Sequence, residues 1–419
     1  MTSLLRPMRG PVLTCAVVLA AAACNMDVTN PSVIDAGKFD PTKDGQTLSL
    51  SAQTNLYIAY QNVAVYGGLI AEELWTGAVR LQTNRLSARS FSSTDDINTD
   101  FFALLSLAIA SNENAVTALE AGANAGSDAN LARASMNAGF ALELMAETMC
   151  SGVVQSGPEL SDAQLLDSAI ARFTTAVTVG TAAGATDIVN ASNVGLARAY
   201  LQAGQYANAA TAAGLVPPSF IANVVTSASS STLATLSNQF HLLTISGNLV
   251  APVRYRVGDA RVPVDSTQVA TQSTLNGLPY IVQGKYTSYA DPIRLASGLE
   301  ARYIAAEAAL HQDGSTTAAL ALIDERRGVG GQGAYSGATD TLSVMAELLN
   351  QRARDFWLEG KKLGDLRRNP SVPLTAVLAD PAGAPFYRPA GAPSFGSTLC
   401  VPIPPEETNA NPNFSIAAR

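Results

Sequence analysis

Two segments of the chain share a spacing of glycine and alanine that constrains the fold more than any other feature of the sequence. In the first, Tyr200 is followed by Gly204 and then by Ala209. In the second, Gly314 is again followed by an alanine five positions later, at Ala319. Glycine after a helical run commonly ends the helix, and a small residue early in the next helix lets the two helices cross closely. The spacing therefore predicts two helix hairpins of the same design.

These hairpins resemble tetratricopeptide repeats, in which small residues lie where the paired helices touch. A partial third match places a second helix at Ala169, Phe173 and Ala176. Its first helix is expected at Leu131 to Thr148, displaced by an insertion. Alanine-rich helix packing without a repeat gives similar alternation, but two hairpins in register favour the repeat. The matched positions are Leu196, Ala197, Tyr200, Gly204, Tyr206 and Ala209, then Tyr303, Ala306, Glu307, Leu310, Gly314, Ala319 and Ile323.

The predicted fold is mostly α, a tetratricopeptide-like helical repeat scaffold with an irregular, loop-rich insertion that carries short strands. The repeats cover about 131–216 and 293–327, and the insertion covers about 217–292. Ser, Thr, Val and Pro are frequent in the insertion, and strands are expected at 249–255 and 279–282.

Helical periodicity also covers 45–122, where the stretch from Trp75 to Asp96 is expected to be a loop, and 342–367. From Asn369 onward, Pro and Gly dominate and no long helix fits. We expect 45–419 to form a single domain.

The N-terminus has the features of a bacterial export signal. Arg6 and Arg9 give it a positive start, and the run from Pro11 to Ala23 carries no charge. This run is too short to span a bilayer and ends in small residues, as a cleavable signal does. Cys24 follows as a lipoprotein cysteine does, so we expect 1–23 to be removed and Cys24 to be lipidated. The alternative is an ordinary secretory signal with an incidental cysteine.

Residues 24–44 contain Asn-Pro and Asp-Pro turn pairs and are expected to form a tether that leads from the lipid. Charged residues interrupt every later apolar run, so no transmembrane helix is expected after the signal. The net charge of −8, without basic clusters, argues against nucleic acid as a partner. The two histidines, His241 and His311, are far apart in sequence and predict no metal site.

Cysteine usage points to one disulfide. Of the four cysteines, Cys15 lies in the signal and Cys24 is expected to carry lipid, which leaves Cys150 and Cys400. An exported protein meets oxidising conditions, so an even remainder predicts a Cys150–Cys400 bond. Two buried free thiols are the alternative.

Catalytic motifs give little support to an enzyme. Residues 328–333 match G-x-G-x-x-G, but a predicted helix, not a strand, precedes them, so we expect a glycine-rich connecting loop. The acidic pairs Glu72-Glu73, Asp95-Asp96 and Glu406-Glu407 are adjacent in sequence, whereas glycoside hydrolysis needs two carboxylates facing each other across a cleft. We expect these pairs to be solvated surface. There is no G-x-S-x-G nucleophile motif.

Aromatic residues on predicted loops are candidates for ligand contact, because planar rings offer large apolar faces at low entropy cost. Trp75 follows a long apolar helix, and Tyr280, Tyr286 and Tyr289 cluster in the insertion. We expect ligand binding at Trp75, Asn84 and Tyr280, where an indole could stack on a sugar face and an amide could bind its hydroxyl edge. Core packing is the alternative for each ring.

Several motifs occur in an order that resembles the RagB/SusD family of outer-membrane nutrient-binding lipoproteins. The chain has Lys362 where the family has Arg, and Ser297 and Gly298 depart from the family helix. The chain is also shorter than many members. The matching segments are Cys24 with 27–31, a helix expected to run from Ile293 through Tyr303 to Ala308, the block 359–368, and 401–407 with 411–413.

The resemblance implies a cell-surface, lipid-anchored protein of the outer membrane that binds an oligosaccharide or other nutrient. Family members deliver it to a SusC-like TonB-dependent outer-membrane transporter, and they need no cofactor and do no covalent chemistry. Two other classes stay open: a helical-repeat scaffold for envelope protein assembly, and a divergent glycan-cleaving enzyme. Repeat proteins bind partners through concave faces, but the long insertion argues against a pure scaffold.

The lipid anchor gives the first prediction. Cys24→Ser should abolish labelling by a palmitate analogue and release the protein from membranes, because the acylated side chain is lost. Metabolic labelling followed by membrane fractionation measures both effects. Unchanged membrane attachment of the variant would show that Cys24 is not the anchor.

Overall fold

The computed structural model describes residues 40–77, 80–228, 236–266, 281–387 and 394–414. Cys24, the predicted signal peptide, most of the predicted tether and Tyr280 lie outside these ranges. Two compact units are distinguished, Met1–Asp44 and Gly45–Arg419. The first helix, α2, begins at Pro41, so the last four residues of the predicted tether are helical.

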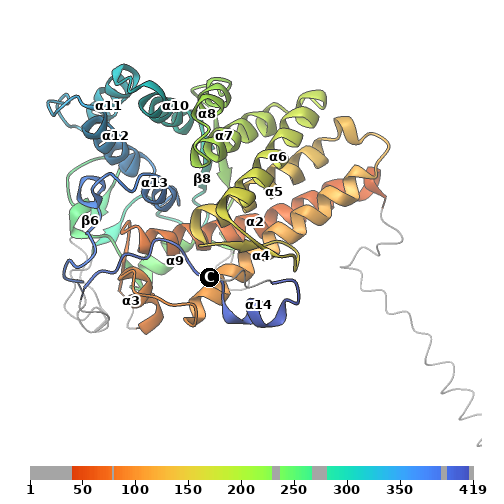
Figure 1. Ribbon diagram of the computed structural model, residues 1–419, viewed down its shortest axis with the longest axis horizontal. Helices are drawn as coiled ribbons and strands as arrows, with labels where there is room; N and C mark the ends of the chain where they lie inside the picture. Colours follow the sequence, from red (N-terminus) through yellow and green to blue (C-terminus); the bar gives the residue numbers. More distant parts are fainter. Residues whose placement is uncertain (1–39, 78–79, 229–235, 267–280, 388–393, 415–419) are drawn as a thin grey trace, which may run out of the picture. The chain divides into compact units, whose positions relative to one another are not determined.

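The described chain is mostly helical, as predicted, and its strands are short and paired in antiparallel twos (Figure 1). The helices are α2 (Pro41–Ile70), α3 (Leu81–Ser87), α4 (Asp96–Glu120), α5 (Ala129–Thr148), α6 (Asp162–Ala182), α7 (Thr186–Gln202), α8 (Tyr206–Gly214), α9 (Gln239–Ile245), α10 (Gly298–Asp313), α11 (Thr317–Val329), α12 (Thr341–Asp355), α13 (Lys362–Arg368) and α14 (Pro405–Ala410). The strand pairs are β1 (Trp75–Thr76) with β5 (Leu249–Val250), β2 (Gly152–Val153) with β3 (Glu159–Leu160), β4 (Ile221–Val224) with β8 (Ile293–Ser297), and β6 (Val264–Asp265) with β7 (Val282–Gln283).

The predicted repeat hairpins are present as α5–α6, α7–α8 and α10–α11, and each contacts the next (Figure 1). Gly204 and Gly314 adopt φ of +72° and +69° between the paired helices, a conformation that costs glycine little. Ala209 and Ala319 are fully buried where the second helices cross the first. The glycines therefore lie at the ends of the first helices and the alanines at the helix crossings, as the spacing predicted.

Packing between hairpins depends on Phe173 of α6. Its ring lies edge-on to Phe140 of α5, with centroids 4.9 Å apart. A Cβ added at Gly195 of α7 would come within 2.3 Å of the Phe173 ring, and one at Gly139 of α5 within 2.8 Å. Glycine at both positions lets the ring fit between α5 and α7.

Three local predictions were wrong. Residues 293–297 form strand β8, not the start of a helix, because they pair with β4 and the Ser297 side chain caps α10 by accepting from the Glu300 amide. The stretch from Trp75 to Asp96 contains β1 and α3 and is not one loop. The helix expected over 342–367 is broken between α12 and α13, where Leu358 and Gly360 have φ of +59° and +71°.

Within the described part of the chain, one helix, α4, is long and apolar enough to cross a membrane by length and composition, although 44% of its most apolar window is buried in the protein. Phe101, Leu105 and Ile109 on this helix pack into the core. Core helices of soluble proteins pass the same test, so α4 is weak evidence for a membrane span.

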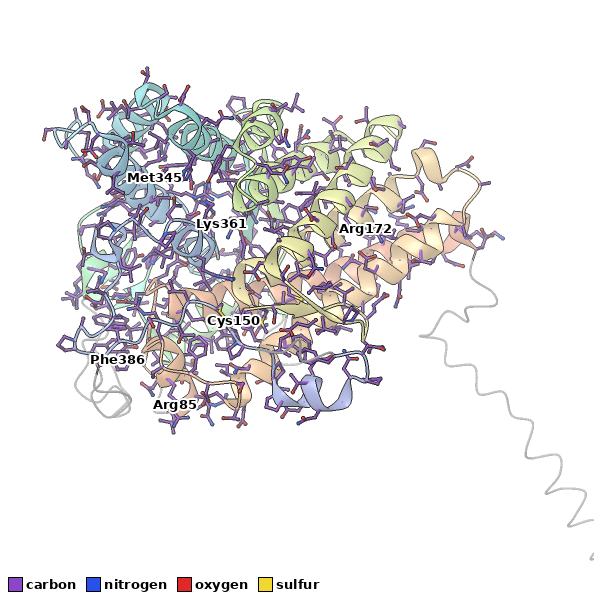
Figure 2. The ribbon with its side chains drawn as sticks, in the orientation of Figure 1. Arg85, Cys150, Arg172, Met345, Lys361 and Phe386 are labelled. Atoms are coloured by element: carbon purple, nitrogen blue, oxygen red, sulfur yellow. A yellow bond between two sulfur atoms is a disulfide. The ribbon has the colours of Figure 1, made fainter. Side chains whose placement is uncertain are left out.

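A buried ion network joins the repeat hairpins to the C-terminal part of the chain. Glu300 of α10 accepts from Arg198 Nε of α7 at 2.8 Å and lies 3.4 Å from Lys361 Nζ and 3.5 Å from Arg352 Nη2. Arg198 also pairs with Glu143 of α5, and Arg352 with Asp365 of α13. Each of these side chains is at most 7% exposed. Figure 2 labels Lys361 within this region.

The carboxyl-terminal segment returns to the end of α5. Met149 and Val401 form a parallel bridge, and the Cys150 amide donates to the Val401 carbonyl at 2.9 Å. The structure joins Cys150, labelled in Figure 2, to Cys400 in a disulfide with Cα atoms 4.9 Å apart. Asn411 Nδ2 adds a hydrogen bond to the Gly157 carbonyl at 2.8 Å. This segment is thereby held against the first repeat region.

The disulfide gives the second prediction. It closes a loop with a sequence separation of 250 residues. Chain-entropy arguments put the stabilisation from such a closure near about 5 kcal/mol, less any strain. Mass spectrometry of unreduced peptides should find Cys150 linked to Cys400, and the double Cys→Ser variant should unfold at lower denaturant. Two free thiols in freshly exported protein would contradict it.

The ion network gives the third prediction. Burial alone would raise the pKa of Glu300, but Arg198, Lys361 and Arg352 outweigh it and lower the pKa to about 2. Glu300→Gln should lower the free energy of unfolding by about 3 to 5 kcal/mol at pH 7, since it leaves buried cations without their carboxylate. Denaturant unfolding measures this loss.

The sign of the pH effect follows from the lowered pKa. The Glu300 contribution is fully present above its usual pKa near 4.5 and is lost as pH falls through about 2, so wild type and variant should converge in acid. Glu325→Gln is the matched control, because Glu325 forms an exposed pair with Arg302 and should cost less than about 1 kcal/mol. Equal losses for the two variants would refute the role of Glu300.

Candidate ligand-binding site

Trp75 is positioned by the turn that ends α2. The amides of Glu73 and Leu74 both donate to the Gly68 carbonyl, and Glu72 adopts a positive φ of 56°. Trp75 then pairs with Val250 in the β1–β5 ladder. The main chain at Trp75 is therefore fixed between the end of α2 and the insertion.

A cluster of four aromatic residues surrounds this position, and we call it the aromatic site: Trp75, Phe386, Tyr387 and Phe395. The Trp75 and Tyr387 rings stack with centroids 4.2 Å apart and an angle of 15° between planes. Phe386 and Phe395 are buried behind Tyr387, whereas Trp75 and Tyr387 are only half-buried. The stacked rings are therefore partly exposed, and they pack against buried phenylalanine side chains.

Two hydrogen bonds hold the Tyr387 ring in the stack. The Thr76 amide donates to the Tyr387 hydroxyl at 2.8 Å, and that hydroxyl lies 2.7 Å from Ser87 Oγ. β1, the end of α3 and the C-terminal segment meet at this hydroxyl. Trp75 Nε1 is enclosed, and among the described residues it has no hydrogen-bond partner.

A buried ion cluster lies next to the aromatic site and is centred on Glu72. The Glu72 carboxylate is 3.0 Å from Arg89 Nη2 and 3.4 Å from Arg254 Nη2, and it accepts from the Asp380 amide at 2.7 Å. The Arg89 guanidinium also lies over the Phe395 ring, 4.8 Å from its centroid. Burial raises the pKa of Glu72 to about 7, against the attraction of Arg254 and Arg89.

Glu73, the next residue in the same turn, is buried as well. Its carbonyl accepts from Trp357 Nε1 at 2.9 Å and its carboxylate accepts from the Leu358 amide at 3.3 Å. Burial raises the pKa of Glu73 to about 7 and lowers that of Lys362 to about 8, and the attraction between the two groups opposes both shifts.

The prediction that Glu72 and Glu73 are solvated surface was therefore wrong. The prediction was also wrong for Asp95, which is 5% exposed, whereas Glu72 and Glu73 are each at most 1% exposed. The cations that neutralise Glu72 and Glu73 lie at positions 89, 254 and 362. The sequence around the two glutamates therefore gave no indication that they are buried.

The predicted ligand residues are not brought together as a set within the described chain. Trp75 belongs to the aromatic site, and Tyr280 lies outside the described residues. Asn84 is on α3, which contacts β1, but it is only 5% exposed and its Nδ2 donates to the Arg80 carbonyl at 2.8 Å. The role of Asn84 in ligand binding stays a prediction.

The other tyrosines of the insertion have structural contacts. Tyr286 is buried, stacks on Phe240 and donates from its hydroxyl to the Leu358 carbonyl, as the core-packing alternative predicted. Tyr289 lies edge-on to His241. Sequence reasoning missed Tyr387, although Phe-Tyr in a segment rich in Pro and Gly was the signal that could have identified it.

The glycine-rich run forms the connection between α11 and α12. Gly330 follows the last residue of α11, and Gly331 adopts φ of +71°. A Cβ on Gly330 would lie 2.5 Å from Arg261 Nη2 and 2.6 Å from Asp259 Oδ2, so close packing explains this glycine. Among the residues that the structure describes, no group of three or more His, Cys, Asp and Glu could hold a metal ion.

No family model matches the sequence, and no curated protein matches it either. Solved structures do match. A SusD superfamily protein from Parabacteroides distasonis has a TM-score of 0.68 at 14% identity, over 90% of this chain and 99% of that one. Surface glycan-binding protein A from Bacteroides uniformis has a TM-score of 0.65 at 13% identity, over 89% and 99%.

A SusD-like carbohydrate binding protein from Bacteroides vulgatus has a TM-score of 0.64 at 15% identity, over 90% of this chain and 98% of that chain. Identities this low establish likeness of fold. The chain therefore has the fold of the SusD superfamily over most of its length.

Proposed function

We propose that this chain, which has a SusD-like fold, is a cell-surface lipoprotein that binds an oligosaccharide and delivers it to a TonB-dependent outer-membrane transporter. Two of its structural neighbours are described as glycan- or carbohydrate-binding proteins. The export signal and Cys24 support the lipid anchor. The proposed role is capture without covalent chemistry.

The observation that carries the proposal is the Trp75–Tyr387 stack. Sugar rings have apolar faces that pack on aromatic planes, and a rigid, pre-formed platform loses little entropy when a ligand binds. The two hydrogen bonds to the Tyr387 hydroxyl and the β1–β5 pairing supply that rigidity.

Ligand binding at the aromatic site gives the fourth prediction. Trp75→Ala should weaken binding of the best ligand from a neutral glycan panel at least about tenfold, since a central aromatic contact is typically worth on the order of 2 kcal/mol. The melting temperature should change by only a few degrees, because the ring is half-buried. Isothermal calorimetry and a thermal melt measure the two quantities.

Tyr335→Ala is the matched control, since Tyr335 is a partly buried ring on the α11–α12 connection whose hydroxyl donates to the Ala338 carbonyl. It should bind glycan like the wild type. If Trp75→Ala unfolds or binds normally, the indole is a core or bystander residue.

Cleavage of a panel glycan would instead support an enzyme, and co-purification of a TonB-dependent barrel tests the transporter partner.

A further inference from the structure

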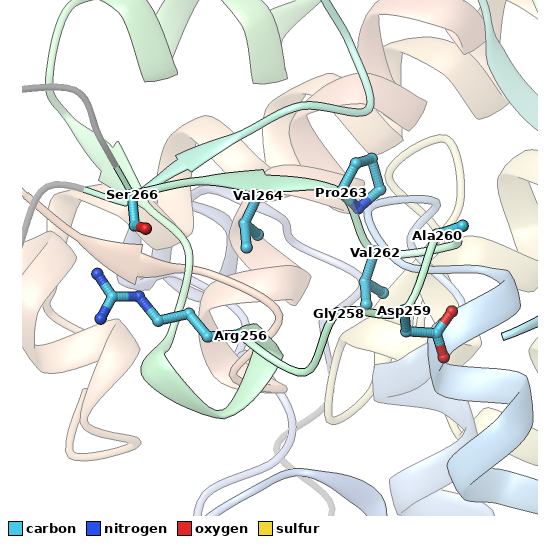
Figure 3. Close-up of a pocket in the computed structure, with 8 residues that line it drawn as sticks. All are labelled: Arg256, Gly258, Asp259, Ala260, Val262, Pro263, Val264 and Ser266. Carbon is cyan, nitrogen blue, oxygen red and sulfur yellow. The ribbon is translucent and has the colours of Figure 1, made fainter. Parts of the chain in front are cut away.

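A second concave feature lies in the insertion, apart from the residues of the aromatic site. It is a cavity of about 340 Å³ formed by the chain between Arg256 and Ser266 (Figure 3). The chain reverses at Gly258, which has φ of +70°, and turns again where the Val262 amide donates to the Asp259 carbonyl at 3.0 Å. Residues 256 and 266 thus lie on facing parts of one loop.

The apolar wall comes from the extended segment that leads into β6. Val262, Pro263, Val264 and Ser266 all line the cavity, whereas Asp265 does not. Pairing of Val264 with Gln283, and the Gly284 amide donating to the Pro263 carbonyl at 2.7 Å, fix this register. The cavity therefore has a preformed aliphatic wall with a hydroxyl at its end.

Arg256 supplies a positive charge that the described residues leave uncompensated. Its side chain is exposed and has no ion pair or hydrogen bond with any described residue. The neighbouring arginines differ, since Arg254 pairs with Asp380 and Glu72, and Arg261 pairs with Asp259.

The carboxylate of Asp259, which also lines the cavity, does not cancel this charge. It accepts from the Arg261 amide, from Arg261 Nε and Nη2, and from Gln332 Nε2 at 3.2 Å. Burial would raise the pKa of Asp259, but the hydrogen bonds from Arg261 outweigh it and lower the pKa. In Figure 3 the carboxylate points away from Arg256 and Ser266.

We propose that this cavity binds a carboxylate group, carried by an acidic sugar residue or by a small organic acid. The Arg256 guanidinium would hold the two carboxylate oxygens in its planar fork, and the Ser266 hydroxyl would donate to an oxygen of the ligand. The skeleton of the ligand would lie against Val262 and Val264. A volume at the low end of ligand pockets suits one ring or a short chain. This site is independent of neutral glycan binding at Trp75.

Ligand-observed NMR titration of the full chain tests the proposal with three probes. Galacturonate and galactose share a ring but differ in the carboxylate, and hexanoate carries a carboxylate without a sugar. We expect millimolar binding of at least one acid and at least about tenfold weaker binding of galactose. Binding of galacturonate alone identifies an acidic sugar as the ligand, and binding of hexanoate alone identifies a small organic acid.

Arg256→Ala should weaken binding of the acid at least tenfold, with Arg256→Lys in between because lysine keeps the charge but loses the fork. Arg302→Ala removes the same charge from an exposed pair on α10 and should leave binding unchanged. Trp75→Ala should also leave it unchanged, which separates this site from the aromatic site. Normal binding by Arg256→Ala, equal binding of galactose, or no binding of either acid by the wild type overturns the proposal.

Discussion

The rest of the structure depends on the charges that meet at Glu300. This carboxylate is fully buried and compensates Arg198 of α7, Arg352 of α12 and Lys361, the residue before α13. A buried charge without its partner is costly, so each member fixes where the others can lie. Because Glu143 and Asp365 extend the network, its ion pairs connect α5, α7, α10, α12 and α13. The apolar hairpins supply most of the burial, and the ions supply the specificity.

The same block of sequence connects this network to the aromatic site. Lys361 donates to the Leu295 carbonyl near Glu300, whereas Lys362 donates to the Leu378 carbonyl and to the Tyr255 hydroxyl. Two consecutive lysines thus hold the repeat scaffold on one side and the insertion and C-terminal segment on the other. Two residues beyond Leu378, Asp380 donates from its amide to Glu72, three residues before Trp75. The hydrogen bond between Asp380 and Glu72 therefore links the C-terminal segment to the turn that leads to Trp75.

Sequence reasoning succeeded where the determinant is local. Gly204 and Gly314 end their helices because each must adopt a positive φ, a requirement visible in one residue. It failed at residues 293–297, where apolar periodicity suited a helix but strand β4, from about seventy residues earlier, provides a pairing edge. It failed again at Leu358 and Gly360, where a continuous apolar stripe predicted one helix but the chain adopts positive φ angles and the helix is interrupted. At this interruption Glu359 forms ion pairs with Lys285 and Arg294.

By itself, the sequence determined the helical class and the hairpin positions, because each rests on residues within a few turns of one another. Only the tertiary structure decided that Glu72 and Glu73 are buried, that Tyr387 stacks on Trp75, and that the Arg256 side chain has no partner among the described residues beside an apolar wall. The Tyr387 hydroxyl and the Thr76 amide are separated by 311 residues, and no local propensity encodes such a pair. Burial, ion pairing and ring stacking are properties of the partners, and the partners meet only when the chain has folded.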